Sequence, residues 1–228
     1  MPTKDAGAGA GHEPEGAGDA SAAAAASTGS GTSPPAAEGR PLRAAEKIRR
    51  TASELFYREG IRAVGVDEIV SRAGVTKPSL YRSFASKDAL AGAYMADYDA
   101  EYWRRFDAVA AEYPGDPRAQ VLAFFRSAAS RAVKPGYRGC GMTNAVVEYP
   151  DDPAHPVRVV SEANKRALRA RLRGLAAAMG AADADTLGDG LMLLLEGTYA
   201  SGQLFEVDGP AIALVEAADR LIAAFLKD

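Results

Sequence analysis

Apolar residues recur at every third or fourth position through most of the chain beyond residue 42, a spacing typical of amphipathic helices. Proline and glycine stand between successive apolar stretches, where they end one helix and let the chain turn before the next. The pattern therefore predicts an all-α protein. Helices are expected over residues 42–59, 66–73, a short segment around Leu80, 87–113, 117–133, a short segment within 139–149, 156–179, 185–205 and 209–226.

Residues 66–87 carry two short helical patterns separated by Gly74. Gly74 can adopt the positive φ that ends a helix, Thr76 is predicted to cap the second helix, and Pro78 suits its first turn. The second helix would turn Leu80 inward and leave a polar outer surface. Such a helix-turn-helix suits a DNA groove, although the bare motif also fits a surface turn between two core helices.

The residues around this motif extend the pattern. In chain order they are Ala52, Leu55-Phe56, Glu59-Gly60, Val66 to Val70, Ala73-Gly74-Val75, Leu80-Tyr81, Phe84 and Ser86 to Leu90. With this order and spacing, the segment from Ile48 to Leu90 resembles the N-terminal domain of TetR-family transcriptional regulators. The resemblance implies a three-helix DNA-binding domain over residues 40–86. It also implies a helical domain over residues 87–228 that binds an effector and forms a dimer.

The same resemblance assigns a DNA-facing surface residue by residue. The positions at the DNA are Thr76, Lys77, Pro78, Ser79, Tyr81, Ser83 and Lys87. Tyr81 and Lys87 are expected at phosphates, whereas Lys77 and Ser79 are better placed for base edges. Gly65 stands where many relatives have a capping threonine, so a phosphate contact by that hydroxyl is not expected here. The implied partner is a palindromic double-stranded DNA operator.

Charge and composition fit a local DNA footprint. Residues 43–90 carry ten Lys or Arg and six Asp or Glu, a net charge of +4 within a chain whose net charge is −3. The one cysteine excludes an internal disulfide framework and favours a cytoplasmic protein, and no apolar run is long enough to span a membrane. Residues 1–39 contain no Leu, Ile, Val or aromatic residue and are expected to form a disordered tail rich in Ala, Gly and Ser.

The long helix after residue 86 is the most aromatic stretch of the chain, which suits either an apolar wall for a ligand or ordinary core packing. Further on, Asn144 and Glu148 would share one face of a short helix and give a pocket a polar lining. The candidates for effector binding are Trp103, Phe106, Phe125, Cys140, Asn144, Glu148 and Tyr199. Together they favour a mostly apolar effector of modest size.

The last two segments, 185–205 and 209–226, are strongly apolar, and the first contains small residues that let another helix approach closely. Two such helices from each of two subunits can form a four-helix interface around a twofold axis. By resemblance, this is the homodimer contact. Segment 156–179 has a basic face that fits either a second nucleic-acid site or a solvated surface paired with acids of neighbouring helices, and the paired surface is favoured.

The leading hypothesis is a homodimeric repressor that a small-molecule effector releases from its operator, with activation still open. A redox signal sensed by Cys140 is an alternative to the effector. An enzyme would need Cys140 beside His155 with an acid such as Glu148, and nothing in the sequence brings them together, so no enzyme is expected. The chain has no zinc-binding spacing and no phosphate-binding glycine loop, so neither a metal nor a cofactor is expected.

Overall fold

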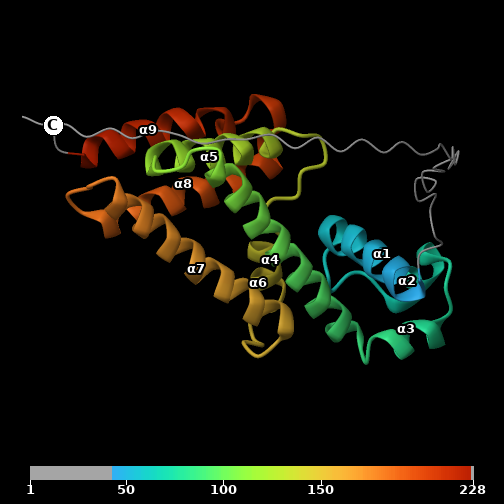
Figure 1. The fold of residues 1–228 in the computed structure, drawn as a ribbon. Helices are drawn as coiled ribbons and strands as arrows, with labels where there is room; N and C mark the ends of the chain where they lie inside the picture. Colours follow the sequence, from blue (N-terminus) through green and yellow to red (C-terminus); the bar gives the residue numbers. More distant parts are fainter. Residues whose placement is uncertain (1–42, 227–228) are drawn as a thin grey trace, which may run out of the picture. The chain divides into compact units, whose positions relative to one another are not determined.

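The computed structural model describes residues 43–226, and the regular structure over this range is helical (Figure 1). The tail expected over residues 1–39 lies outside the described residues. The elements up to residue 205 are α1 (Ala44–Glu59), α2 (Val66–Ala73), α3 (Lys77–Ser83), α4 (Lys87–Ala111), α5 (Pro117–Ala132), α6 (Gly141–Glu148), α7 (Pro156–Ala178) and α8 (Ala184–Phe205). The all-α class predicted from the sequence is confirmed. None of the helices described between residues 43 and 226 is long and apolar enough to cross a membrane.

The chain after α8 differs from the predicted single helix. Two short 3-10 turns, η1 (Glu206–Asp208) and η2 (Pro210–Ala213), precede α9 (Leu214–Phe225). The backbone at Gly209 is extended, with φ −84° and ψ 168°, so the chain does not enter an α-helix at that point. The tighter turn of η2 follows, and the α-helix begins five residues later than residue 209.

Local sequence signals set most of the helix ends. Gly74 ends α2 in the left-handed region, with φ 62° and ψ 42°, and the hydroxyl of Ser86 accepts a hydrogen bond from the amide of Ala89 at 3.0 Å. The expected side-chain cap at Thr76 is wrong. Thr76 does occupy the cap position of α3, but its hydroxyl lies 3.0 Å from the hydroxyl of Ser79 and makes no bond to a backbone amide. One of these two hydroxyls donates to the other instead.

Helices α1, α2 and α3 form a small bundle, here called the head. Each helix contributes a fully buried side chain to its centre, namely Ile48, Ile69 and Leu80. Helix α1 also packs against the start of α4, where the ring centroids of Phe56 and Tyr94 are 5.6 Å apart (Figure 1). Helix α4 therefore joins the head to the remaining helices, α5 to α9, here called the body.

The body is held together by close helix packing. Helices α7 and α8 pack tightly at Gly188, where an added Cβ would lie 2.7 Å from backbone atoms of Arg173. Helices α5 and α8 meet at Gly202, where a Cβ would lie 2.8 Å from the carbonyl oxygen of Ala132. The expectation that small residues of α8 allow close helix contact is thus confirmed at Gly202, although this contact is within the chain.

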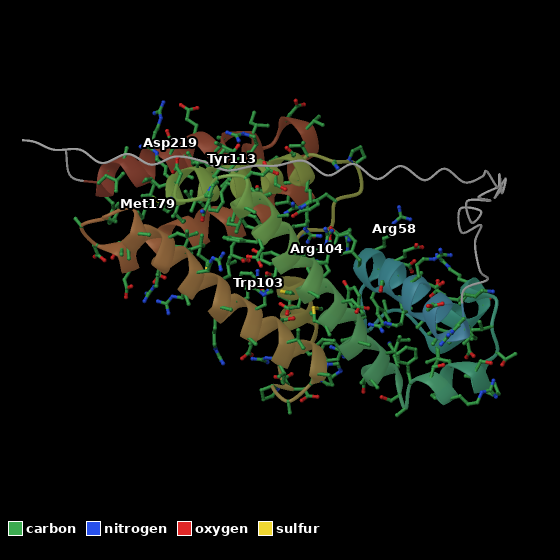
Figure 2. The ribbon with its side chains drawn as sticks, viewed as in Figure 1. Arg58, Trp103, Arg104, Tyr113, Met179 and Asp219 are labelled. Carbon is green, nitrogen blue, oxygen red and sulfur yellow. The ribbon has the colours of Figure 1, made fainter. Side chains whose placement is uncertain are left out.

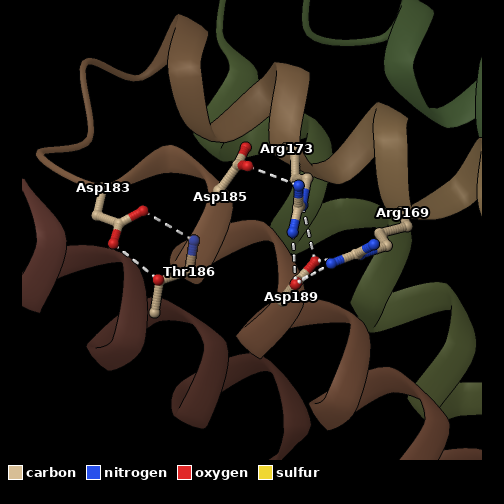
Figure 3. A network of polar contacts seen from close by, with 6 residues as sticks. All are labelled: Arg169, Arg173, Asp183, Asp185, Thr186 and Asp189. Carbon is tan, nitrogen blue, oxygen red and sulfur yellow. Dashed lines mark hydrogen bonds and ion pairs between the residues drawn. The ribbon is translucent and has the colours of Figure 1, made fainter.

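The basic face of α7 is paired with acidic residues, as favoured from the sequence. Asp189 of α8 accepts hydrogen bonds from the guanidinium groups of Arg169 and Arg173, at distances from 2.6 to 2.8 Å (Figure 3). These hydrogen bonds hold the pKa of the Asp189 carboxyl well below its usual range. The other pairs on this face join Arg158 and Arg166 to Glu162, Lys165 to Glu196, Arg171 to Asp107 and Arg173 to Asp185. This face is therefore a paired surface rather than an open cationic one.

Candidate functional site

Helix α3 divides sharply into an inner and an outer face. Leu80 is fully buried in the head, whereas the next residue, Tyr81, keeps 49% of its surface exposed. The other residues expected at DNA are exposed, apart from Ser79 and Lys87, which are partly covered. No other element in the described part of the chain covers the outer face of α3. This face is therefore free to enter a DNA groove.

Two of the residues expected at base edges already have polar partners. The ammonium group of Lys77 lies 2.7 Å from the carboxylate of Asp67 on α2, and this hydrogen bond raises the pKa of Lys77. The hydroxyl of Ser79 accepts a hydrogen bond from the guanidinium of Arg82 at 2.8 Å. Both partners are exposed, so DNA can replace them at small cost.

Arg82 is a candidate that the sequence reasoning missed. Its guanidinium is exposed and lies against Ser79, three residues earlier on the same face of α3. The i, i+3 spacing to Ser79 is the signal that would have found it. Ser83 donates a hydrogen bond to the carbonyl oxygen of Ser79 at 3.1 Å, so its hydroxyl proton is engaged along the helix.

Lys87 and Glu148 hold the linker between α1 and α2 from two sides. The ammonium of Lys87 donates a hydrogen bond to the carbonyl oxygen of Arg62 at 3.3 Å. The amide of Arg62 donates to the carboxylate of Glu148 at 2.8 Å, and its guanidinium donates to the Glu148 carbonyl at 3.2 Å. Lys87, expected at a phosphate, and Glu148, expected at a ligand, therefore both connect the head to other helices in this structure.

Two cavities lie between the head and the body. The first, here called the linker cavity, measures about 370 Å³ and lies between residues 60–63 and α6. The second, here called the tyrosine cavity, measures about 360 Å³. Its lining includes Tyr57, Tyr98, Tyr102, Tyr137 and Tyr199, with Arg105, Arg131, Lys134 and Cys140 among them. Both volumes are in the range of small-molecule sites.

The structure separates the residues expected in one effector site into three groups. Asn144 and Glu148 share a face of α6, as predicted, and line the linker cavity. Cys140 and Tyr199 line the tyrosine cavity. Trp103, Phe106 and Phe125 line neither cavity and pack in an aromatic core around Phe124, with Trp103 on the middle of α4 (Figure 2).

Tyr57 connects the head directly to the tyrosine cavity. It belongs to α1, yet its hydroxyl donates a hydrogen bond to the carbonyl oxygen of Gly139 and accepts one from the amide of Arg138, both at 3.2 Å. Its ring also stacks on Tyr98 of α4, with ring centroids 6.4 Å apart. Residues 138–139 belong to the loop before α6. Tyr57 of the head is therefore hydrogen-bonded to a loop that forms part of the cavity wall.

Cys140 and His155 have different neighbours. The thiol of Cys140 is buried and accepts a hydrogen bond from the ammonium of Lys165 at 3.3 Å, and Lys165 also pairs with Glu196. The ring of His155 stacks on Tyr149, with ring centroids 3.8 Å apart, and its Nδ1 accepts a hydrogen bond from the amide that follows Pro156. The structure thus does not form the Cys–His pair that an enzyme would need.

Comparison with known proteins gives the family. Residues 48–94 match the profile of bacterial regulatory proteins of the tetR family. The fold resembles the crystal structure of a TetR-family transcriptional regulator from Streptomyces coelicolor with a TM-score of 0.76 and 34% sequence identity, over 81% of this chain and 96% of that one. The chain belongs to the TetR family.

Two curated relatives of this TetR-family protein are also regulators. The transcriptional regulator AcuR from Cereibacter sphaeroides is 32% identical over 113 residues, which are 48% of this chain and 52% of that protein. The transcriptional repressor NemR from Escherichia coli strain K12 is 27% identical over 96 residues, 42% of this chain and 48% of that protein. The chain thus spans about half the length of each. As a member of this family it is a DNA-binding transcriptional regulator and not an enzyme.

The contact between Glu148 and the Arg62 amide predicts a local effect on the head of this TetR-family protein. In Glu148→Ala, we expect the amides of residues 60–64 to exchange with solvent about tenfold faster, because a hydrogen bond to a charged acceptor contributes on the order of 1.5–3 kcal/mol. Hydrogen–deuterium exchange followed by mass spectrometry measures this rate. Asp151→Ala removes the same charge from the following exposed loop and should leave these amides unchanged. Equal exchange in both variants would contradict a connection through Glu148.

Proposed function

We propose that this regulator is a homodimeric repressor that binds a palindromic operator through α3 and leaves it when a small molecule occupies the tyrosine cavity. Residues 40–86 would form the DNA-binding domain and residues 87–228 the effector-binding and dimerisation domain. The observation that carries the proposal is the outer face of α3, which is polar and exposed directly above the buried Leu80. The relative NemR is described as a repressor, and repression is the sign of regulation proposed here.

The proposed DNA contacts follow from the chemistry of this face. Lys77 and Ser79 would reach base edges, with Thr76, Pro78 and Ser83 beside them, while Tyr81 and Lys87 would bind phosphates. Arg82 joins this set because its guanidinium lies beside Ser79. In a dimer the two α3 helices would enter successive major grooves about 34 Å apart on one side of the duplex.

The dimer would form through α8 and α9. Between these helices runs an apolar groove of about 570 Å³ whose lining includes Leu194, Leu214 and Leu221. At its edge Leu193 keeps 73% of its surface exposed, and Gly197 has no neighbouring atom within 4 Å of an added Cβ. A second copy of α8 and α9 would cover this surface and complete a four-helix interface.

Effector control would pass through Tyr57. This residue belongs to α1 of the head and lines both cavities, so a ligand that displaces it or the loop at 138–139 changes how the head is held. A hundredfold loss of operator affinity requires a coupling free energy of about 2.7 kcal/mol. This free energy equals the net contribution of a few hydrogen bonds. Tyr57 and Glu148 together form four hydrogen bonds between the head and the body.

Operator binding tests the proposal. We expect selection from a random duplex pool to recover a palindrome, and Tyr81→Ala to weaken binding to it by about tenfold, because an exposed phosphate contact and its packing surface are lost. Fluorescence anisotropy over a series of salt concentrations measures the affinity. Tyr81→Phe is the matched control that separates the hydroxyl from the ring.

Two results would contradict this reading of α3. The first is recovery of no preferred sequence by the wild-type protein. The second is a Tyr81→Ala protein that binds the selected operator as tightly as wild type at every salt concentration, because the proposed phosphate contact of Tyr81 would then contribute nothing to binding.

A redox signal is a second candidate for the control step, supported by the Lys165 ammonium 3.3 Å from the Cys140 thiol. Oxidants convert a cysteine thiol stepwise to sulfenic acid and higher oxides. Because Cys140 is buried, oxidation of the thiol itself fits better than a disulfide between subunits. If peroxide releases wild type and Cys140→Ser from the operator equally well, this candidate fails.

A further inference from the structure

The tyrosine cavity has an unbalanced charge. Arg105, Arg131 and Lys134 all line it, and no carboxylate does so among the described residues. Arg105 pairs with Glu101 at 2.9 Å, but neither Arg131 nor Lys134 forms an ion pair with the side chains that the structure describes, among which Glu206 is not included. Among these side chains, the guanidinium of Arg131 donates to the hydroxyl of Ser127, at 2.8 Å. The wall therefore presents positive charge that the described side chains do not neutralise.

One of these cations has a donor with no acceptor. The Nε of Arg105 is buried and makes no hydrogen bond within the described residues, although another nitrogen of the same guanidinium pairs with Glu101. A buried donor without an acceptor is unfavourable, and most such groups in proteins have a partner. Arg105 also lines the cavity, so its positive charge would attract an anion bound there, although the Nε atom itself is covered.

Phenol hydroxyl groups of the cavity lining also have protons that are available for donation to a ligand. Tyr98 accepts a hydrogen bond from the amide of Gly141 at 3.1 Å, which leaves its own proton free. Tyr102 and Tyr199 lie 3.4 Å apart, so only one of the two can donate to the other. Tyr137 makes no side-chain hydrogen bond within the described part of the chain. Burial raises the pKa of all four phenols, so they stay protonated at neutral pH.

The tyrosine rings themselves provide flat apolar surfaces for a ligand body. Tyr57 and Tyr98 are stacked with an interplanar angle of 26°, and Tyr199 has the ammonium of Lys165 over its ring. Aromatic walls of this kind pack favourably against another ring. A cavity of about 360 Å³ accommodates a compact molecule rather than a long chain.

We propose that the tyrosine cavity binds an aromatic carboxylate of one or two rings, whose carboxylate is held by Arg105, Arg131 and the phenol hydroxyls. This inference rests on the proposed function, because it names the chemical class of its effector. In this arrangement the ring would lie among the tyrosines, and the carboxylate would supply acceptor oxygens to the guanidinium groups and phenol hydroxyls of the lining. It replaces the mostly apolar effector expected from the sequence with an anionic one.

Isothermal titration of the full-length protein without DNA tests this directly. The probes are benzoate and 2-naphthoate, each compared with its own amide, and benzylamine as a cation of similar size. We expect each carboxylate to bind about tenfold or more tightly than its amide, because hydrogen bonds to a charged group are the stronger ones. Benzylamine should bind more weakly than benzoate and more weakly than the amide of benzoate.

Variants on one helix locate the anion. Arg131→Gln should weaken carboxylate binding by about tenfold while leaving amide binding unchanged. Arg126→Gln, an exposed position on the same α5 helix outside the cavity lining, should change neither. Arg105→Gln, which removes the other guanidinium proposed to hold the carboxylate, gives a second test if Arg131→Gln does not fold, as judged by circular dichroism.

Three results would overturn the inference: an amide or benzylamine that binds as tightly as the carboxylates, an unchanged carboxylate affinity in the folded cavity variant, or no binding of any probe up to about 10 mM. The same preparations are tested on the selected operator in parallel. Operator binding without carboxylate binding refutes only the effector class. Absence of a preferred operator refutes the proposed function, whatever the titration shows.

Discussion

Leu193→Arg is expected to convert the proposed dimer into a monomer and to weaken operator binding on the order of 100-fold, because two linked half-sites bind far more tightly than one. Leu193 keeps 73% of its surface exposed at the edge of the groove between α8 and α9. In the proposed dimer this position is covered, and an unpaired guanidinium placed there loses its hydration. Analytical ultracentrifugation gives the oligomeric state, and fluorescence anisotropy gives the affinity.

Val159→Arg is the matched control for that change. Val159 is also apolar and exposed, at 53%, but it lies on α7 and does not line the groove between α8 and α9. The control should remain dimeric and bind the operator as wild type does. A Leu193→Arg protein that stays dimeric would show that the subunits meet elsewhere and that the apolar surface of α8 and α9 has another role.

Gly188→Ala is expected to lower the free energy of unfolding by about 2–3 kcal/mol, since overpacking of a tight interior contact is costly. The added Cβ would lie 2.7 Å from the amide nitrogen and Cα of Arg173, and backbone atoms cannot turn aside as a flexible side chain can. Helices α7 and α8 would have to separate. That movement would also strain the hydrogen bonds of Arg173 to Asp185 and Asp189, which flank this contact (Figure 3).

Gly174→Ala provides the matched control on α7. An added Cβ at Gly174 has no neighbouring atom within 4 Å, so alanine should raise the free energy of unfolding by roughly 0.5–1 kcal/mol through its better helix propensity. Urea unfolding at one fixed protein concentration measures both variants, because the stability of a dimer depends on concentration. Equal stability of Gly188→Ala and wild type would contradict the close packing of α7 on α8.

The helix boundaries could be predicted well because their signals are local. Gly74 takes a positive φ, Ser86 caps α4, and Pro117 and Pro156 begin helices where a missing amide hydrogen costs nothing. Each of these outcomes depends on residues within one turn of the signal. The failed prediction of a cap at Thr76 also has a local cause. The hydroxyl of Ser79, three residues later, takes the place of the backbone amide as the hydrogen-bond partner of Thr76.

The proposed effector site could not be predicted to the same degree because its lining depends on how distant helices pack. Phe106 and Tyr102 are four residues apart on α4, yet Phe106 packs against Phe124 in the core while Tyr102 also lines the tyrosine cavity. No local pattern distinguishes these two positions. The cations Arg131 and Lys134 come from α5 and the loop after it, and only the folded chain brings them to the same cavity as Tyr199 of α8.

For Glu148, the sequence predicted the helix face but not the residue that this face contacts. Its spacing from Asn144 correctly predicted a shared helix face, and both residues do line one cavity. The partner of Glu148, however, is the amide of Arg62 in the head, 86 residues earlier in the chain. Sequence periodicity can give the face of a helix, but it cannot tell which element that face meets.

Hydroxyl-radical footprinting of the full-length protein on its selected operator tests the central claim most directly. If two α3 helices read one palindrome, two protected patches should appear on one side of the duplex, with centres about 10 base pairs apart. At a protein concentration just sufficient to saturate wild type, Tyr81→Ala should protect each patch only partly, in line with its expected roughly tenfold weaker binding. A single patch, or two patches on opposite sides of the duplex, would contradict a dimer that places α3 in successive major grooves.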